Sequence, residues 1–148
     1  MEVNFFAAAE LIRAALPALR SGRKPMIVNV GSILGHRGIP RMSEYCASKF
    51  ALQGFSQSLR AELASSGIDL LVVSPGTTET PFFDHAISSE PSPWPKQRGV
   101  TAAHVARKAR RAIESGRHEV IINSHGRMLV LLNRIAPRLV DRILTRYG

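Results

Sequence analysis

The sequence is poor in the residues from which disulfides and metal sites are built. It has one cysteine, Cys46, and five histidines that show no metal-ligand spacing. One cysteine cannot form an internal disulfide, which fits a reducing compartment. We interpret Cys46 as a small buried filler and expect most of the histidines at the surface. The sequence therefore predicts neither a disulfide framework nor a metal centre.

Long apolar runs are also missing. No run reaches the length of a membrane span, and the first apolar stretch is periodic like an amphipathic helix rather than like a signal peptide. The net charge of +9 is high for 148 residues, which brings nucleic acid and anionic membranes into consideration. Zinc-ligand spacing, a helix-turn-helix pattern and aromatic residues interleaved with basic ones are all absent. We predict one cytoplasmic domain over 1–148, peripheral to a membrane at most, without a nucleic-acid partner.

The apolar pattern that is present alternates between helical and extended periodicity. One predicted strand, Ile68–Val73, is a nearly continuous apolar run, interrupted only by Asp69, which is typical of a parallel sheet covered on both faces. A strand, a helix and a strand in succession predict a right-handed crossover. The sequence therefore predicts an α/β fold with helices over Glu2–Arg20, Ser43–Ser65 and Thr101–Ser115 and strands over Met26–Val30, Ile68–Val73 and Glu119–Asn123. Pro17 is expected to kink or end the first helix.

The stretch from Ser32 to Lys49 carries the candidate chemistry. Ser32 lies just past the first predicted strand, and Tyr45 and Lys49 lie one turn apart at the start of the following helix. The phenol and the ammonium should therefore share one face, with the intervening loop folding Ser32 back over them. Glycines in that loop imitate a phosphate-binding turn, but Pro40 intervenes before any helix signal, so we interpret them as turn residues.

The chemistry of these three groups can be estimated. Tyrosine alone has a pKa of about 10, too high for acid-base work at neutral pH. A cation about 5 Å away, at an effective dielectric constant of about 20, favours the phenolate by roughly 3 kcal/mol. Lys49 is therefore predicted to lower the pKa of Tyr45 by about two units. A phenol that exchanges a proton with a carbonyl or alcohol oxygen leaves the carbon in need of a hydride, which implies a nicotinamide cofactor.

Together with Pro75-Gly-Thr-Thr-Glu-Thr80, the Ser32 and Tyr45-Cys-Ala-Ser-Lys49 pattern resembles the short-chain dehydrogenase/reductase family, from about Val3 to Val120. The thirteen residues from Ser32 to Tyr45 and the Ser-Pro-Gly that ends the second strand make the likeness specific. The resemblance implies catalytic roles for Asn4, Ser32, Tyr45 and Lys49, with the serine and tyrosine holding the substrate oxygen and the lysine holding the cofactor ribose. It also implies cofactor contacts from Tyr45 itself and from Pro75, Gly76, Thr78 and Thr80.

One departure from the family pattern limits this reading. The family begins with a glycine-rich turn that receives the cofactor pyrophosphate, followed later by an Asn-Asn-Ala-Gly segment, and this sequence contains neither. The fold expected is therefore the C-terminal half of a Rossmann-like, doubly wound parallel sheet. We expect an oxidoreductase that uses NAD or NADP on a carbonyl or secondary alcohol. The alternative is a truncated, inactive fragment acting at most as a dimerising or membrane-associating module.

Two further segments concern partners and substrate. The helices over residues 2–20 and 43–65 have wider apolar stripes than one sheet face needs, and helices in these positions build a dimer contact in the family, so we predict a homo-oligomer. Ala86–Gly99 has two open interpretations, a substrate lid or a plain solvent loop.

The C-terminal segment, 126–148 after a core over 1–125, forms an amphipathic helical stripe that Pro137 breaks or kinks. Its basic side carries five arginines against one acid, Asp141. We favour packing on the body or on a partner over a helix lying on an anionic membrane surface.

Overall fold

The fold was analysed in a computed structural model, which describes residues 1–81 and 99–147. The predicted loop or lid over Ala86–Gly99 therefore lies outside the described residues, except for Gly99. Within the described ranges every predicted helix and strand is present, with ends that differ by a few residues. The elements in chain order are η1 (Glu2–Phe6), α1 (Ala7–Ser21), β1 (Met26–Val30), η2 (Ile33–Gly35), α2 (Ser43–Leu63), η3 (Ala64–Ser66), β2 (Asp69–Ser74), β3 (Thr78–Glu79), β4 (Val100–Thr101), α3 (Ala102–Glu114), β5 (Glu119–Ile121), α4 (Ser124–Ile135), α5 (Pro137–Leu144) and η5 (Thr145–Tyr147).

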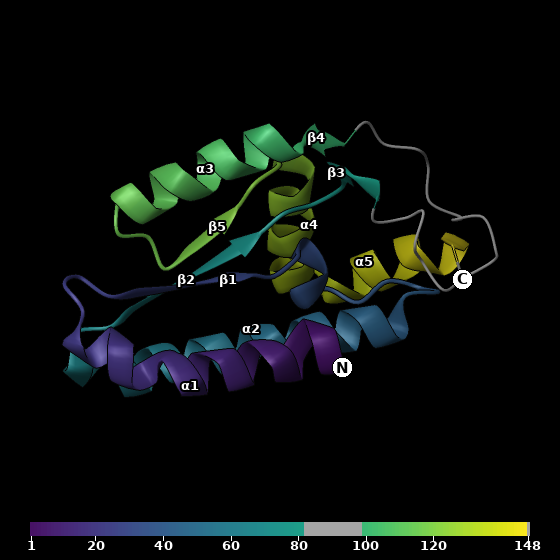
Figure 1. The fold of residues 1–148 in the computed structure, drawn as a ribbon. Coiled ribbons are helices and arrows are strands. Elements are labelled where there is room, and N and C mark those ends of the chain that lie inside the picture. The colour runs from purple at the N-terminus through teal and green to yellow at the C-terminus, as the bar shows by residue number, and fades with distance from the viewer. Residues whose placement is uncertain (82–98, 148) are drawn as a thin grey trace.

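The main sheet has the order β1-β2-β5, and both of its ladders are parallel. Helices α1 and α2 cover one face of this sheet and α3 covers the other (Figure 1). Since α2 connects β1 to β2 and α3 precedes β5, each parallel pair is joined through a helix on one side of the sheet. The predicted α/β, doubly wound architecture is confirmed. A second, two-stranded parallel sheet joins β3 to β4.

The core explains why β2 is apolar from Leu70 to Val73. Leu70 and Val72 point into a cluster with side chains of α1 and α2, whereas Leu71 and Val73 point into a second cluster with α3 and β5. Alternate residues of a strand face opposite sides of a sheet, so a central strand covered on both sides needs apolar residues at every position. The β2 strand is therefore the centre of both hydrophobic clusters.

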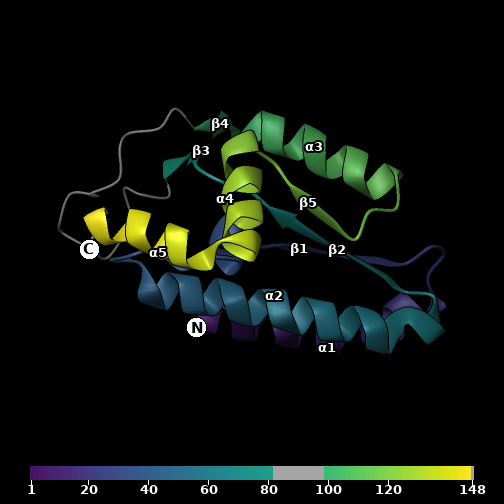
Figure 2. The same ribbon diagram turned by 180° about the vertical axis from the view of Figure 1, so that it is seen from behind.

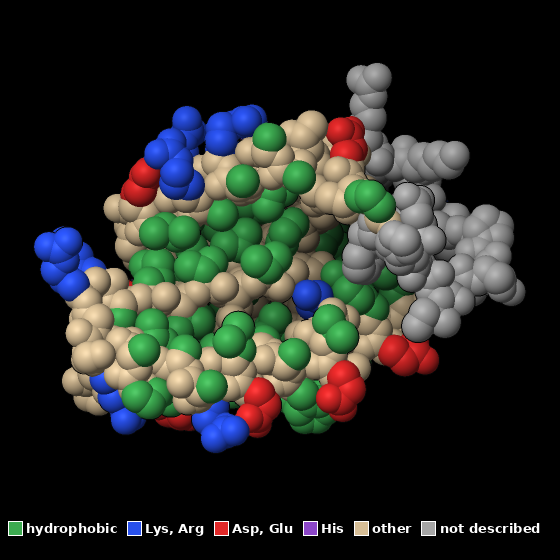
Figure 3. Space-filling model, viewed as in Figure 1, with side chains coloured by type: hydrophobic (Ala, Val, Ile, Leu, Met, Phe, Trp, Pro, Cys, Tyr) green, Lys and Arg blue, Asp and Glu red, His purple; other side chains and the backbone are tan. Residues whose placement is uncertain are grey.

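The β1 strand is the edge of the described sheet. Its Ile27 and Asn29 are buried against the α1–α2 layer, but Val28 and Val30 are exposed on the opposite face, Val30 by 60%. In the space-filling view, hydrophobic side chains gather in the trough between α3 and α1 where β1 runs (Figure 3). An apolar face beside an unpaired strand edge is a surface that favours association with another chain.

Two prolines behave differently from each other. Pro17 was expected to kink or end the first helix, yet α1 continues past it to Ser21, so the expectation that it ends the helix is wrong. A proline removes its own backbone donor, and the turn that follows keeps its own hydrogen bonds. Pro137, in contrast, divides the C-terminal segment, because it is the first residue of α5, where a missing N–H costs least.

The C-terminal helices pack on the body, as favoured from the sequence. Val130 of α4 and Val140 and Leu144 of α5 are buried. Arg37, in the loop before α2, donates to Asn133 of α4 at 3.0 Å and to Asp141 of α5 at 2.5 Å. Helices α4 and α5 lie on one side of the sheet, in front of it when the molecule is seen from behind (Figure 2).

Two glycines, the buried Gly35 of η2 and the exposed Gly54 of α2, allow a stability test of the fold. A Cβ on Gly35 would lie 2.8 Å from the Lys49 carbonyl oxygen, whereas a Cβ on Gly54, inside α2, would meet nothing within 4 Å. We expect Gly35→Ala to lower the free energy of unfolding by about 1–3 kcal/mol through overpacking. Gly54→Ala should raise it by about 0.5–1 kcal/mol, because alanine has the better helix propensity. Urea unfolding followed by circular dichroism measures both, and an unchanged midpoint for Gly35→Ala would contradict the close contact.

Candidate active site

The candidate site lies where the parallel strands end. Ser32 follows β1, and Pro75 and Gly76 follow β2, so all three lie at the carboxyl edge of the sheet, where ligands bind in such folds. Backbone hydrogen bonds join the two strand ends, from Gly31 N to the Val73 oxygen at 2.8 Å and from Ile33 N to the Pro75 oxygen at 3.0 Å. The relative position of the two loops is therefore set by the backbone itself.

Ser32 is held by a short helical turn. It is the N-cap of η2, and its Oγ accepts a hydrogen bond from the backbone of Leu34 at 3.1 Å. The turn presses against α2 at Gly35, next to the Lys49 carbonyl. Gly35 has no positive φ, so its importance comes from this close approach and not from a left-handed turn. The segment after β1 opens into a three-residue helix, too short to form the anion site of a phosphate loop.

Tyr45 lies between Ser32 and Lys49 in the contacts it makes, as the spacing predicts. The Tyr45 phenol is hydrogen-bonded to the Ser32 side chain. The Lys49 ammonium lies over the phenol ring, 5.8 Å from its centroid, and donates to the Val30 carbonyl at 3.2 Å. One face of α2 and the end of β1 thus bring a hydroxyl, a phenol and a cation together.

The electrostatics differ from the expectation. Burial raises the pKa of Tyr45 above its ordinary value, and the hydrogen bond from Ser32 offsets this only in part. Burial also lowers the pKa of Lys49. The predicted lowering of the Tyr45 pKa by Lys49 is therefore wrong for this structure, because loss of solvent around the phenol outweighs a cation that lies over the ring and is drawn to the Val30 carbonyl. Tyr45 is accordingly a neutral phenol, able to donate a proton, at neutral pH.

Asn4 reaches the site indirectly. Its side-chain amide donates to Ser48 Oγ at 3.2 Å, and Ser48 Oγ donates to the backbone carbonyl of Tyr45 at 2.7 Å. Asn4 lies in the π-helical turn η1, a local irregularity that often accompanies functional positions. The structure therefore connects Asn4 to the backbone of the tyrosine and not to its hydroxyl.

Part of the segment after β2 makes contacts within the chain. Thr78 Oγ1 donates to the Gly76 carbonyl at 3.0 Å, and Thr80 is exposed. A Cβ on Gly76 would lie 2.2 Å from Asn123 Nδ2, so the Asn123 side chain packs directly against this glycine and would have to move for any larger residue. The Lys49 ammonium and the exposed Thr80 hydroxyl are donor groups of a kind that suits a nicotinamide and its ribose, whereas the Thr78 hydroxyl already donates to the Gly76 carbonyl.

Sequence reasoning missed a buried polar cluster beside the site. His36 was expected among surface histidines, yet only 8% of its side chain is exposed, and its Nε2 lies 2.9 Å from Glu119 Oε1. Gln53 of α2 donates to the same carboxylate oxygen at 3.0 Å, and the Oγ of buried Ser74 lies 3.4 Å from His36 Nε2. These residues are far apart in sequence, so no local pattern could have indicated that they meet.

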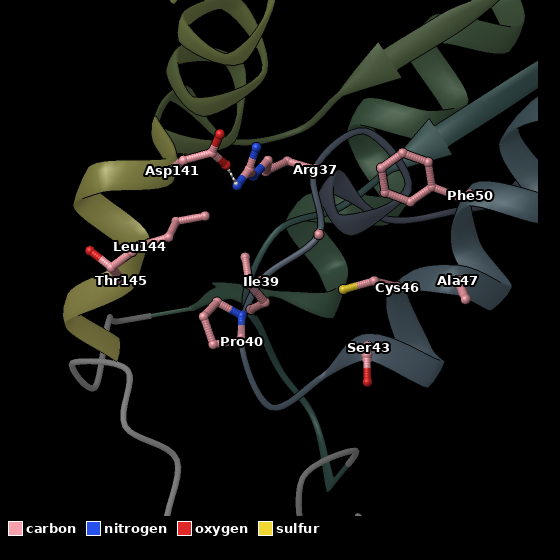
Figure 4. A pocket seen from close by; sticks show the side chains of 11 residues that line it. Arg37, Ile39, Pro40, Ser43, Cys46, Ala47, Phe50, Asp141, Leu144 and Thr145 are labelled. Atoms are coloured by element: carbon pink, nitrogen blue, oxygen red, sulfur yellow. Dashed lines mark hydrogen bonds and ion pairs between the residues drawn. The ribbon is translucent and has the colours of Figure 1, made fainter. Parts of the chain in front are cut away.

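Cys46 faces away from this cluster. A pocket of about 710 Å³ lies between the loop at Arg37–Pro40, the start of α2 and the end of α5, and Cys46, Phe50 and Leu144 line it (Figure 4). Cys46 is buried and its thiol pKa is raised mainly by burial, so it remains a thiol and the interpretation as a buried filler is confirmed. In the described parts of the chain, no group of three or more histidine, cysteine or acidic side chains is arranged to hold a metal ion.

Known proteins of similar fold share this arrangement of elements. A short chain dehydrogenase from Burkholderia cenocepacia in complex with NADP superposes with a TM-score of 0.81 at 26% identity, covering 97% of this chain and 56% of that one. A short chain dehydrogenase/reductase from Burkholderia phymatum in complex with NAD gives a TM-score of 0.77 at 23% identity, over 93% of this chain and 57% of that one, which supports the fold alone.

Sequence comparison agrees. Rat dehydrogenase/reductase SDR family member 7B is 33% identical over 150 residues, 97% of this chain and 46% of that protein. The ketoacyl reductase HetN of Nostoc is 32% identical over 154 residues, 98% of this chain and 52% of that protein. The chain thus spans about half the length of these relatives. The family model for short chain dehydrogenases matches residues 1–91, and the chain belongs to this family.

Proposed function

We propose that this chain carries the catalytic side chains of an NAD(P)-dependent oxidoreductase that transfers hydride between a nicotinamide cofactor and a carbonyl or secondary alcohol. The observation that carries the proposal is the hydrogen bond between Ser32 and Tyr45 at the carboxyl edge of the sheet, with the Lys49 ammonium over the phenol ring. Two hydroxyls that already meet can both reach one substrate oxygen. The family membership and the NADP held by the similar structure from Burkholderia cenocepacia support the same reading.

The proposed proton donor is Tyr45. Because burial keeps its phenol protonated at neutral pH, it can deliver a proton to a carbonyl oxygen as that carbon is reduced. Ser32 donates a hydrogen bond to the same oxygen and orients it. The resemblance to the family gives Asn4 the role of holding a water in a proton relay. Its contact through Ser48 to the backbone of Tyr45 would hold the start of α2 in place beside that water.

The proposed cofactor contacts lie on either side of these hydroxyls. Lys49 would hold the ribose, with Pro75, Gly76, Thr78 and Thr80 along the nicotinamide end. When bound, the nicotinamide supplies or accepts the hydride that no side chain can provide. The contacts that select NAD or NADP would come from a glycine-rich half that this chain does not contain.

The rival proposal is an inactive fragment. Placement of the nicotinamide against the substrate dominates the rate of such a reaction, and the pyrophosphate contacts at a glycine-rich helix N-terminus are not part of this sequence. Losing contacts worth several kcal/mol weakens binding tenfold for every ~1.4 kcal/mol. We therefore expect the chain by itself to bind the cofactor weakly.

The two proposals separate in a turnover test. The isolated chain should show no micromolar binding of NADH or NADPH by fluorescence and no turnover on a carbonyl panel. Joined behind the glycine-rich half of the Burkholderia cenocepacia dehydrogenase, it should turn over, and Tyr45→Phe should lower kcat by about 10²–10⁴-fold through loss of the proton donor.

Tyr147→Phe is the matched control, since it removes the other tyrosine, which lies in η5 far along the chain. It should leave kcat of the chimera unchanged. Equal activity of Tyr45→Phe and the unmodified chimera would refute the assigned acid-base role, and micromolar cofactor binding with turnover by the isolated chain would refute its incompleteness.

A homo-oligomer through η1, α1 and α2 is the proposed assembly. Their outward faces carry Val3, Phe6 and Leu11 on the first two elements and Phe50 on α2, all exposed, with Leu11 71% exposed. Exposed large apolar residues on neighbouring helices are typical of protein interfaces.

We expect a dimer in sedimentation velocity that Leu11→Glu converts to a monomer, because a charge placed at the interface would be buried unpaired. Leu131→Glu, which changes an equally large exposed residue on α4, should leave the dimer intact. A monomeric parent chain, or a dimer that survives Leu11→Glu, would exclude this interface.

Contact with an anionic membrane surface is the second proposed role, and it concerns α4 and α5. Their outward faces expose apolar side chains, of which Ile135 is the most exposed at 74%, beside exposed arginines. The apolar set is Met128, Leu131, Ile135, Leu139 and Ile143, and the basic set is Arg127, Arg134, Arg138, Arg142 and Arg146. Among the described residues no helix is long and apolar enough to cross a bilayer. This pattern of apolar and basic side chains suits a helix lying in the lipid interface.

The chain should therefore sediment with vesicles that contain phosphatidylglycerol and remain in solution with pure phosphatidylcholine. Leu131→Glu should reduce binding severalfold, and higher salt should weaken it, because both apolar insertion and charge attraction contribute. Leu11→Glu serves as the control and should bind like the parent. Equal binding to both lipids, or to none, would count against membrane contact.

A further inference from the structure

We propose that the buried His36 side chain and the half-buried Glu119 carboxylate form a positioning group for the candidate active site, which fixes the segment after β1 so that the Ser32 hydroxyl meets the Tyr45 phenol. The proposal rests on the proposed function for its meaning, since it assigns a task to residues that support the acid-base pair. It concerns side chains that touch neither substrate nor cofactor in the mechanism above.

The His36 side chain contacts residues of two neighbouring strands. His36 follows Ser32 by four residues, at the end of η2, and only 8% of its side chain is exposed. Its Nε2 lies 2.9 Å from Glu119 Oε1 and 3.4 Å from Ser74 Oγ. Ser74 is the last residue of β2, directly before Pro75. The imidazole therefore ties the Ser32 segment to the ends of two neighbouring strands.

Glu119 is also hydrogen-bonded to helix α2. Gln53 donates to the same Glu119 oxygen at 3.0 Å, and Gln53 lies one turn after Lys49 and two turns after Tyr45 on that helix. Glu119 thus accepts from the loop that carries Ser32 and from the helix that carries Tyr45. A single carboxylate spans the two elements whose separation decides whether the hydroxyls meet.

The Glu119 side chain carries a negative charge. Hydrogen bonding to His36 is the largest cause holding the pKa of Glu119 below its ordinary value, and Gln53 and Arg134 act in the same direction. Glu119 is therefore a carboxylate at neutral pH. A half-buried carboxylate with two donors loses its compensation if one donor leaves, so the position of His36 is strongly preferred.

The loop is also held from its other side. The His36 carbonyl accepts from Asn133 Nδ2 at 3.4 Å, and Gly35 presses on the Lys49 carbonyl. These contacts hold the backbone near residue 36, whereas the Glu119 contact holds its side chain and sets the rotation of the turn. Ser32 Oγ is positioned by that turn through its hydrogen bond from Leu34 N.

The test uses the two tyrosines of the chain. Tyr147→Phe leaves Tyr45 as the only phenol, whose titration is read from phenolate absorbance. In this background Tyr45 should titrate above its ordinary 10.0, and Ser32→Ala should raise the midpoint further by removing a hydrogen bond that favours the phenolate. His36→Leu should raise it in the same direction by about half to one unit. His36→Gln keeps a donor for Glu119 and should titrate like the parent.

A double-mutant cycle separates positioning from a general loss of structure. If His36 acts through Ser32, His36→Leu should cause no further shift in the Ser32→Ala background. The exposed His125→Leu is the matched control and should cause no shift in either background. An equal shift with and without Ser32, or no shift from His36→Leu in the parent, would overturn the proposal.

A further variant tests whether the shift caused by His36→Leu could come from loss of structure. His36→Leu leaves Glu119 short of a donor, so the double change His36→Leu/Glu119→Leu is included, since an apolar pair of similar volume leaves no buried charge unpaired. It should keep the parent circular dichroism spectrum and show the same Ser32-dependent shift of Tyr45, and an unshifted midpoint in this folded variant would also overturn the proposal. The titration of Tyr45 needs neither cofactor nor turnover. A double-mutant cycle that contradicts positioning by His36 therefore leaves the oxidoreductase proposal intact. In the same way, the cycle can still be measured if the chimera is inactive.

Discussion

The arrangement of the site depends on one steric constraint, the close approach of the turn after β1 to the backbone of α2. The turn and the helix touch where Gly35 faces the Lys49 carbonyl, a distance that only a residue without Cβ allows. Because of this approach, Ser32 on the turn reaches Tyr45 on the helix, and Lys49 reaches back to the Val30 carbonyl. Three groups from separate elements thus converge without a flexible loop to carry any of them.

The same close packing sets the electrostatics. Removing water from around the phenol disfavours its charged form, and the nearby ammonium is itself disfavoured by burial. Tyr45 is therefore protonated, whereas Glu119, which has His36 and Gln53 as donors, is ionised. A phenol and a carboxylic acid already differ in charge at neutral pH, because their ordinary pKa values are about 10 and about 4. The opposite directions of the two pKa shifts follow from the surroundings, since burial is the largest cause for Tyr45 and hydrogen bonding to His36 is the largest cause for Glu119.

The chain leaves more apolar surface uncovered than a closed α/β domain does. The β1 strand has an open edge, and its Val28 and Val30 are exposed. Figure 3 shows hydrophobic side chains gathered in the trough between α3 and α1. Apolar side chains also face outward from α1 and from the C-terminal helices. These surfaces lie on different sides of the molecule, and each fits a different neighbour by its chemistry. The open edge of β1 fits another strand, and the apolar face of α1 fits a pair of helices. The apolar and basic faces of α4 and α5 fit a charged lipid surface.

The sequence by itself determined the order and type of the elements and the convergence of Ser32, Tyr45 and Lys49. Those features follow from local rules, namely apolar periodicity, residues four apart on one helix face and parallel strands that end at one edge. The tertiary structure decided the burial of His36 against Glu119 and the direction of the Tyr45 pKa shift. Both depend on which distant side chains exclude water and supply hydrogen bonds, and such contacts have no signature along the chain.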